Sequence, residues 1–390
     1  MKLRKVISFT IFNVGAVTLV LVVAEGLLSF ATVGKTMLRT TSLAERRHTT
    51  HDDLLGWINQ PDVLVPDMYG KGVYLRTNPQ CFRNNTPTTP ERPRDTVRVI
   101  CSGDSFTLGY GVDNDHTWCQ ELASANPRIE SVNMGQGGYG VDQAYLWYKR
   151  DGLPLEHDVH IFAFVRVDFD RMMSDRFQGY PKPKLEIEDG KLAVRNVPVP
   201  YPRAWPVLLA EWDQAVQRLA LVRGLRKLVG TDDAGSDPLA GPEAVEKTGP
   251  IVASVFADLQ QLNLSKHSTL LLVYLPMRRD YLDGWSDLWR EATREDARRL
   301  GVHFVDLVEA IRRLPQTQVR SFFIAEGAMD YPGAAGHYTE AGNAFVAEQL
   351  SRELRELPGV SEGLRMDQGS ASEPGETFAA PVALTDDLQP

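Results

Sequence analysis

Short apolar runs that alternate with amphipathic helical patterns constrain the fold of this chain more than any other feature of its 390 residues. The apolar runs cover residues 97–101, 129–134, 159–165, 269–275 and 302–307, and the helical patterns cover 117–125, 141–149, 205–229, 251–262 and 285–300. Strands that alternate with helices form βαβ units, in which helices cover both faces of a parallel sheet. The sequence therefore predicts an α/β fold, a three-layer α/β/α sandwich with a central parallel sheet. Ligands of such sheets bind beyond the carboxyl ends of the strands.

The first 34 residues predict a membrane anchor. Lys2, Arg4 and Lys5 precede residues 6–24, which contain no ionisable side chain. As a helix this run would be about 28 Å long, close to the thickness of a bilayer's hydrocarbon core. The basic residues before it favour a cytoplasmic N-terminus and a periplasmic or otherwise extracytoplasmic domain, in a single-pass protein of the cell membrane. A cleaved signal peptide is the alternative, although its apolar region is normally about 7–15 residues long.

Changes in composition divide the rest of the chain. Residues 35–95 are polar and irregular and predict a stalk followed by an ordered lead-in segment. Residues 96–352 carry the strand and helix patterns, with an irregular or hairpin-like excursion expected near 174–204, where five prolines occur, and a surface loop near 231–249. Residues 353–390 are predicted to be an acidic, disordered tail, because they are rich in Ser, Gly, Pro and acidic residues.

Charge and cysteine content argue against several classes of function. The net charge is −9 and no basic stripe is interleaved with aromatic residues, so nucleic acid is not an expected partner. The three cysteines show neither CxxC nor Cys/His spacing, and no metal or other cofactor is expected. If the domain lies outside the cytosol, a Cys81–Cys119 disulfide is one possibility, because Cys101 lies in a strand that is expected to be buried. The alternative is three unpaired thiols.

Ser105 is the candidate nucleophile, because it directly follows the first buried strand in the tripeptide Gly103-Asp104-Ser105. Nucleophilic serine chemistry needs a hydroxyl at the end of a rigid element, a base that takes its proton, and donors for the oxyanion. A glycine permits a tight turn, and a helix that begins at the serine supplies backbone N–H groups. The tripeptide by itself is more typical of a helix N-cap, in which Asp104 or Ser105 accepts bonds from helix N–H groups.

Three segments together resemble the conserved blocks of the SGNH (GDSL-type) hydrolase family. Residues 99–109 resemble the first block, and residues 133–143 resemble the second, whose glycine corresponds to Gly138. Residues 336–343 resemble the final block, in which His337 would be the general base. The resemblance extends over residues 50–352, and its lead-in is like that of membrane-anchored bacterial members. It implies a flavodoxin-like fold and an oxyanion hole formed by the N–H groups of Ser105 and Gly138.

Two positions depart from the family pattern. The third block normally has an asparagine, whose amide is an oxyanion donor, followed by an aspartate; here Val167 precedes Asp168. Either Arg166 or a neighbouring backbone N–H takes the place of that donor, or the hole lacks one. Family members also place an aspartate three residues before the histidine, where this chain has Ala334.

The displaced acid leaves several candidates open. Asp330 is the nearest upstream aspartate, and a loop containing Pro-Gly would have to return it to His337. The alternative is a Ser-His dyad, with Asp330 as a turn residue. Asp306 is a second candidate, although capping of the next helix is the role expected for it. Asp104 and Asp168 are expected to hold loops by accepting backbone N–H bonds.

These residues together predict acyl transfer through an acyl-Ser105 intermediate. His337 would take the serine proton and Asp330 would orient the imidazole. The resemblance implies a small-molecule or glycan O-acyl ester as the substrate, for example an O-acetylated carbohydrate. A polysaccharide O-acetyltransferase would use the same site, and the departures at Val167 and Ala334 leave open a non-catalytic carbohydrate-binding protein on a decayed hydrolase fold.

Two tryptophans mark one face of a predicted helix. Trp205 and Trp212 are seven residues apart in the helical pattern of residues 205–229, so they lie on the same side of the helix. We expect that face to pack against the domain rather than to bind sugar.

Overall fold

The central element is a five-stranded sheet in the order β13-β12-β7-β5-β6, and every neighbouring pair of its strands is parallel. The computed structural model describes residues 12–17, 19–20, 23, 45–217 and 241–364. The strands of the sheet are β5 (Val97–Gly103), β6 (Ile129–Gly135), β7 (Val159–Phe164), β12 (Thr269–Tyr274) and β13 (His303–Asp306). They coincide closely with the five apolar runs, because strands buried on both faces need side chains that are apolar at nearly every position.

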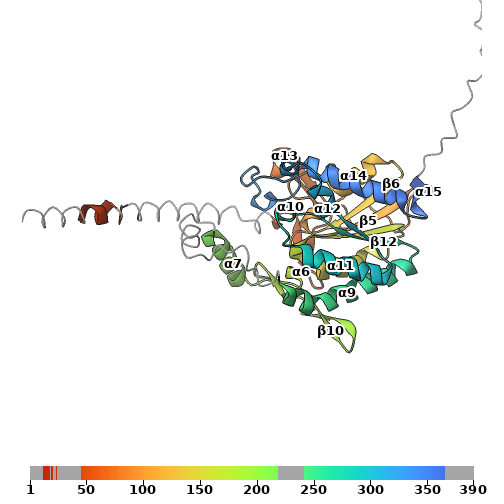
Figure 1. The fold of residues 1–390 in the computed structure, drawn as a ribbon, viewed down its shortest axis with the longest axis horizontal. Coiled ribbons are helices and arrows are strands. Elements are labelled where there is room, and N and C mark those ends of the chain that lie inside the picture. Colours follow the sequence, from red (N-terminus) through yellow and green to blue (C-terminus); the bar gives the residue numbers. More distant parts are fainter. Residues whose placement is uncertain (1–11, 18, 21–22, 24–44, 218–240, 365–390) are drawn as a thin grey trace, which may run out of the picture.

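Helices cover both faces of the sheet and complete the three layers (Figure 1). Along β5, Val99 and Cys101 contribute to one core cluster, whereas Ile100 contributes to the other, as the two-residue period of a strand requires. The cluster of Val99 includes residues of α4 (Trp118–Ala125), α12 (Leu307–Arg312) and α14 (Glu340–Glu356). The cluster of Ile100 includes residues of α5 (Val141–Trp147), α9 (Pro242–Ser265) and α11 (Asp287–Leu300). The predicted α/β/α arrangement is confirmed.

Short antiparallel hairpins and short helices complete the described part of the chain. The lead-in segment contains β1 (Thr49–Asp52) paired with β2 (Gly56–Asn59), and β3 (Leu64–Gly70) paired with β4 (Val73–Arg76). The excursion near 174–204 contains two hairpins, formed by β8 (Arg176–Phe177) with β9 (Tyr180–Pro181) and β10 (Lys184–Glu188) with β11 (Lys191–Arg195). The remaining elements are α3 (Ser105–Leu108), a π-helix (Tyr148–Gly152), α6 (Arg166–Arg171), α7 (Ala204–Gln217), α10 (Arg278–Leu282), α13 (Gln316–Ser321), a 3-10 helix (Pro332–Ala334) and α15 (Val360–Leu364).

The structure differs from the sequence-based expectations at three boundaries. Helix α9 begins at Pro242, within the expected loop, because proline is well tolerated in the first turn of a helix. Helices α14 and α15 extend to Leu364, so residues 353–364 are ordered and do not belong to a disordered tail. Buried Leu354, Val360 and Leu364 hold them on the core. Residues 218–240 and 365–390, where the rest of the expected loop and tail fall, lie outside the described residues.

No helix in the described ranges is both long and apolar enough to cross a bilayer. The predicted anchor, residues 6–24, lies largely outside those ranges, which include only 12–17, 19–20 and 23 of it. The anchor therefore stays a prediction.

The three cysteines are free thiols in the structure, so the Cys81–Cys119 disulfide does not form. Cys119 lies on α4 beside Cys101 of β5, in the core cluster on one face of the sheet. Cys81 packs against the cluster on the other face. The sheet therefore separates the two thiols that the sequence suggested as a pair.

Candidate active site

The nucleophile turn joins β5 to α3 at the carboxyl edge of the sheet. Asp104 is the N-cap of α3, and its Oδ1 accepts the N–H of Phe106 at 2.8 Å. Gly103 is required by close packing, because a Cβ there would lie 2.2 Å from Thr107 Oγ1 and 2.7 Å from the carbonyl oxygen of Ala163. The two interpretations of the tripeptide are therefore compatible. Asp104 caps the helix, and the hydroxyl of Ser105 remains available for chemistry.

His337 lies against Ser105, as the resemblance implies. Its Nε2 is 2.7 Å from Ser105 Oγ. The imidazole packs between the rings of Phe106 and Tyr110, whose centroids lie 4.4 and 4.9 Å from its own. Its backbone is tied to Ile324, whose N–H donates to the carbonyl oxygen of His337 at 2.8 Å. The base is therefore fixed by ring packing and by its backbone.

Burial sets the protonation state of this histidine. Burial lowers the pKa of His337 to about 4, and the nearby carboxylate of Asp104 offsets that effect only in part. The imidazole is consequently neutral at neutral pH. A neutral imidazole 2.7 Å from the hydroxyl of Ser105 is able to accept its proton.

The structure does not bring Asp330 to His337. The side chain of Asp330 is exposed, and no carboxylate among the described residues bonds to His337 Nδ1; the imidazole interacts instead with the backbone of Ala334 and Ala335. The residues between them do not loop out, because Tyr331 and Ala334 are buried in one core cluster and Pro332–Ala334 form a 3-10 helix. The arrangement is a Ser-His dyad.

Asp306 does not orient His337 either. It is the N-cap of α12, where Oδ1 accepts the N–H of Val308, and it also forms ion pairs with Arg290 and Arg294. This is the capping role that its position after the last strand predicts.

Ser105 and Gly138 are the expected oxyanion donors, and the backbone of Gly138 is unusual. Gly138 has a φ of +76°, a conformation that favours glycine. A Cβ at this position would also lie 2.5 Å from Cε1 of Phe177. Within the described part of the chain, the N–H groups of Ser105 and Gly138 donate to no other residue. Both are free to bind an oxyanion.

The side chains of Val167, at the asparagine position of the family, and of its neighbour Arg166 both pack into the protein. Val167 packs against the core cluster of α4 and α14. Arg166 is buried, donates to Asp170 at 2.5 Å, and lies over the rings of Trp285 and Trp289, 5.5 and 5.8 Å from their centroids. These contacts hold the guanidinium of Arg166 against Asp170 and the two tryptophans.

Arg171, at the end of α6, occupies the site instead. Its Nη1 donates to Asp104 Oδ2 at 3.0 Å, to the carbonyl oxygen of Tyr139 at 2.9 Å and to Asp168 Oδ1 at 2.6 Å. Asp104 and Tyr139 directly adjoin Ser105 and Gly138. Asp168 also accepts the N–H of Val165 at 2.9 Å, which is the loop-holding role expected of it. One guanidinium therefore joins the two loops that carry the oxyanion donors.

An aromatic wall covers the Gly138 loop. Phe177, from the β8–β9 hairpin, stacks on Trp57 with ring centroids 6.2 Å apart and lies 5.2 Å from the guanidinium carbon of Arg171. Trp57 Nε1 donates to the carbonyl oxygen of Gly137 at 2.8 Å. The excursion and the lead-in segment thus both reach the site, which periodicity in the sequence does not reveal.

A partly buried carboxylate contacts Tyr110, the ring that packs on the histidine. Glu45 accepts hydrogen bonds from the hydroxyls of Tyr110 and Tyr331, and its Oε2 lies 3.1 Å from His48 Nε2. Burial raises the pKa of Glu45, but His48 and the two tyrosines outweigh it and leave the pKa below its usual value. An ionised residue at the end of the predicted stalk therefore holds Tyr110, the ring that packs on His337.

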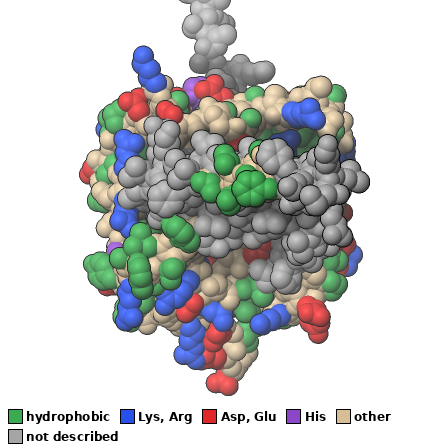
Figure 2. Space-filling model, turned by 90° about the vertical axis from the view of Figure 1, so that its left-hand side faces the viewer, with side chains coloured by type: hydrophobic (Ala, Val, Ile, Leu, Met, Phe, Trp, Pro, Cys, Tyr) green, Lys and Arg blue, Asp and Glu red, His purple; other side chains and the backbone are tan. Residues whose placement is uncertain are grey.

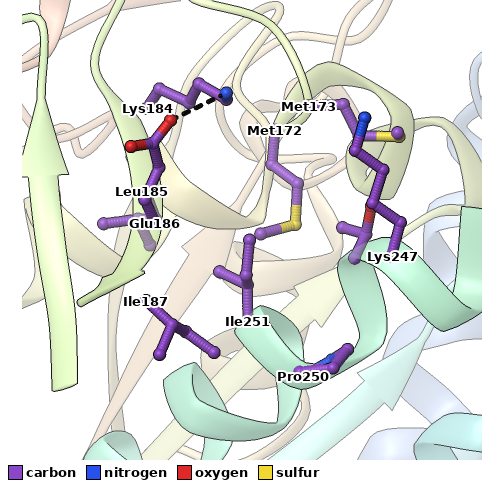
Figure 3. A pocket seen from close by; sticks show the side chains of 10 residues that line it. Met172, Met173, Lys184, Leu185, Glu186, Ile187, Lys247, Pro250 and Ile251 are labelled. Atoms are coloured by element: carbon purple, nitrogen blue, oxygen red, sulfur yellow. Dashed lines mark hydrogen bonds and ion pairs between the residues drawn. The ribbon is translucent and has the colours of Figure 1, made fainter. Parts of the chain in front are cut away.

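A separate pocket of about 320 Å³ opens between the end of α6, strand β10 and helix α9 (Figure 3). Met172 and Ile251 line its floor, and Lys184 and Glu186 form an ion pair of 3.0 Å at its edge. Neither Ser105 nor His337 lines it, so it is not part of the dyad's surroundings.

Comparisons with known proteins found similarity among solved structures. No protein-family model matches the chain, and no curated protein matches it. Among solved structures, it is similar to a lipolytic protein of the G-D-S-L family from Veillonella parvula DSM 2008, with 13% identity and a TM-score of 0.37 over 67% of this chain and 100% of that one. It is also similar to a lipase/acylhydrolase from Enterococcus faecalis, with 12% identity and a TM-score of 0.37 over 67% of this chain and 96% of that one. A third similar structure is the acetyl xylan esterase AlAXEase, with 13% identity and a TM-score of 0.36 over 66% of this chain and 100% of that one. Likeness at this level carries no argument about activity, which rests on the geometry of the site.

Proposed function

We propose that this protein is a serine esterase of the SGNH (GDSL-type) kind that cleaves O-acyl esters through an acyl-Ser105 intermediate. The observation that carries the proposal is the 2.7 Å approach of a neutral, buried imidazole to the hydroxyl of Ser105. Free N–H groups on Ser105 and Gly138 support it, because acyl transfer needs preorganised donors at the developing oxyanion.

The first half of the reaction acylates Ser105. His337 Nε2 takes the hydroxyl proton while Oγ bonds to the ester carbonyl carbon, and the N–H groups of Ser105 and Gly138 bind the oxyanion. The imidazolium then returns the proton to the departing alkoxide as the carbon–oxygen bond breaks, which releases an alcohol.

The second half returns Ser105 to its starting state. A water molecule gives a proton to His337 and attacks the acyl carbon, and Oγ leaves with that proton as the carboxylic acid is released. If a sugar hydroxyl replaces the water, the same steps transfer the acyl group and the enzyme is an O-acetyltransferase.

Arg171 takes the place of the missing amide in this proposal. Only its Nη1 bonds to described residues, and two of those partners adjoin the oxyanion donors. Its positive charge lies beside the position where negative charge develops, and it holds both donor loops in register. The guanidinium therefore stabilises the oxyanion electrostatically and by positioning.

The substrate class we propose is an O-acylated glycan or small ester outside the cytoplasmic membrane. This part follows from the predicted anchor and topology, and it is tested separately from the chemistry. Protease added to intact spheroplasts is expected to remove the folded domain, whereas full protection would contradict the topology.

A fluorophosphonate probe tests the chemistry directly. We expect the purified protein to be labelled, and Ser105→Ala and His337→Ala to abolish labelling. Ser102→Ala is the matched control: Ser102 lies near the end of β5, three residues before Ser105, but it is buried and its Oγ is 2.9 Å from His160 Nε2, so labelling should persist. A wild-type protein that is never labelled would exclude the esterase and favour a non-catalytic binding protein.

A further inference from the structure

Helix α7 (Ala204–Gln217) carries an exposed apolar stripe. Trp205, Leu208, Leu209 and Trp212 are 72%, 41%, 59% and 48% exposed. These positions follow the i, i+3, i+4, i+7 spacing that places side chains on one side of a helix. The expectation that the two tryptophans pack against the domain is wrong.

The opposite side of α7 makes the contact with the domain. Val207 is buried, and the backbone of Pro206 and Val207 lies against Gly179 of the β8–β9 turn, where a Cβ would be 2.6 Å from the carbonyl oxygen of Pro206. The apolar stripe is therefore left over after α7 has docked. The four side chains of the stripe therefore form part of the protein surface and do not belong to the hydrophobic core.

The exposure of these tryptophans stands out within the chain. All seven tryptophans belong to described residues, and the five others are buried or partly buried, which places both exposed ones on this one stripe. Tyr201, just before the helix, is also 74% exposed. Contiguous exposed apolar side chains of this size mark a site that meets a partner or a membrane.

The chemistry around the stripe matches a lipid surface. Tryptophan and tyrosine favour the headgroup boundary of a bilayer, where one end of the side chain is apolar and the other is hydrated. Helix α7 itself has two acidic residues, Glu211 and Asp213, and no Lys or Arg, so its aromatic and aliphatic side chains, rather than its charge, favour a lipid surface. An apolar helix face that remains exposed in this way is typical of helices that lie in the plane of a membrane.

The position of α7 agrees with that partner. In Figure 1, α7 projects from the same side of the domain as the described residues 12–17, and Phe12, Val14 and Val17 there are exposed and apolar. Figure 2, which faces this side, shows hydrophobic side chains with both basic and acidic side chains around them. A bilayer that receives residues 12–17 would lie on the side to which α7 projects.

We propose that α7 lies on the bilayer surface, with Trp205, Leu208, Leu209 and Trp212 in the boundary between headgroups and acyl chains. The contact orients the domain on the membrane. It is independent of the esterase proposal, because no residue of the dyad takes part.

Quenching of tryptophan fluorescence by brominated lipid tests this contact in the full-length protein. The protein is reconstituted into bilayers of phosphatidylcholine and phosphatidylglycerol with plain or brominated acyl chains. Bromination should lower the wild-type emission, and W205F/W212F should remove most of that loss. W285F is the matched control and should retain it, because Trp285 is partly buried beside Arg166 and Arg279.

A second pair of variants keeps both reporters. L208S/L209S should reduce the quenching by brominated lipid. I187S, which changes an apolar residue on β10 that is as exposed as Leu208, should not. If the N-terminal segment is cleaved, the same lipids are added as vesicles. No quenching in wild type, or equal quenching in W205F/W212F, would overturn the proposal. A blue shift of emission with protein concentration in detergent, lost in W205F/W212F, would identify a second copy as the partner and would also overturn it.

Discussion

Replacing Arg171 by methionine separates its two roles, positioning the loops and stabilising the oxyanion. Arg171 Nη1 bonds to two carboxylates, Asp104 and Asp168, whose side chains are only 1% and 2% exposed. Removing one partner of a buried ion pair costs about 3–5 kcal/mol of stability. Loss of one oxyanion donor costs about 2.7–4 kcal/mol, or about 10²–10³ in kcat. Arg171→Met should therefore be both less stable and far slower.

The assay combines the kinetics of 4-nitrophenyl acetate hydrolysis with thermal unfolding. We expect kcat to fall by about 10²–10³ with a much smaller change in KM, because the interaction is made mainly in the transition state. Arg171→Lys retains the charge without the planar fork, and it should recover part of kcat.

A double variant provides the decisive comparison. In R171M/D168N one of the two unpaired carboxylates is neutralised, so much of the lost stability should return while kcat stays low. Recovery of both quantities would show that Arg171 is only structural and would refute its catalytic role. Arg166→Met is the matched control: this buried arginine pairs with Asp170 away from the dyad, so its loss should lower stability without lowering kcat of the folded enzyme.

Two further predictions concern the base and the displaced acid. Because burial lowers the pKa of His337 to about 4, kcat/KM should stay constant through mildly acidic pH and fall only as pH approaches 4. A decrease of kcat/KM near the ordinary histidine pKa of about 6.5 would contradict the buried, neutral base. Between about pH 6.5 and about pH 4, His337 binds a proton in the unfolded chain but not in the folded protein. The free energy of unfolding should therefore fall as pH decreases from about 6.5 to about 4, and this fall should be smaller in His337→Ala. Asp330→Asn should leave kcat and KM unchanged, since the side chain is exposed and no carboxylate among the described residues bonds to His337 Nδ1. A loss approaching the roughly 10⁴-fold effect of a misoriented triad histidine would show that Asp330 reaches the base.

The sequence predicted the sheet well because burial on both faces leaves a strong apolar signature. It also pointed to Ser105 and His337, whose side chains lie 2.7 Å apart in the structure, because each belongs to a recognisable block at the end of a strand or just before a helix. The replacement for the missing amide was not predictable in the same way. Arg171 lies four residues beyond Val167 and points to the site only because α6 forms and its Asp168 and the capping Asp104 converge on one guanidinium.

The displaced acid was misjudged for a related reason. A Pro-Gly pair between Asp330 and His337 suggested a loop that closes on the base. Burial decided otherwise, because Tyr331 and Ala334 belong to a core cluster that also contains Tyr69 and Tyr110, and they hold the segment down. Local turn chemistry predicts where a chain bends, but it does not predict which of the bent residues has apolar partners elsewhere in the fold.

The lead-in segment completes the site in spite of its irregular sequence. Arg83 is fully buried and donates to the carbonyl oxygens of Leu108, Gly109 and Val112, which fixes the loop that follows Ser105. Trp57 holds the Gly137–Gly138 loop from outside. These contacts join residues far apart in the sequence, so periodicity carries no trace of them.

Glu45 extends the same argument to the end of the predicted stalk. Its carboxylate binds the hydroxyls of Tyr110 and Tyr331, and Tyr110 packs on the imidazole of His337. In a Ser-His dyad without a carboxylate on Nδ1, ring packing and the backbone of Ala334 and Ala335 orient the base, so the residue that holds Tyr110 contributes to that orientation. Residue 45 therefore reaches the imidazole through one intervening ring, which makes the segment before the sheet part of the site.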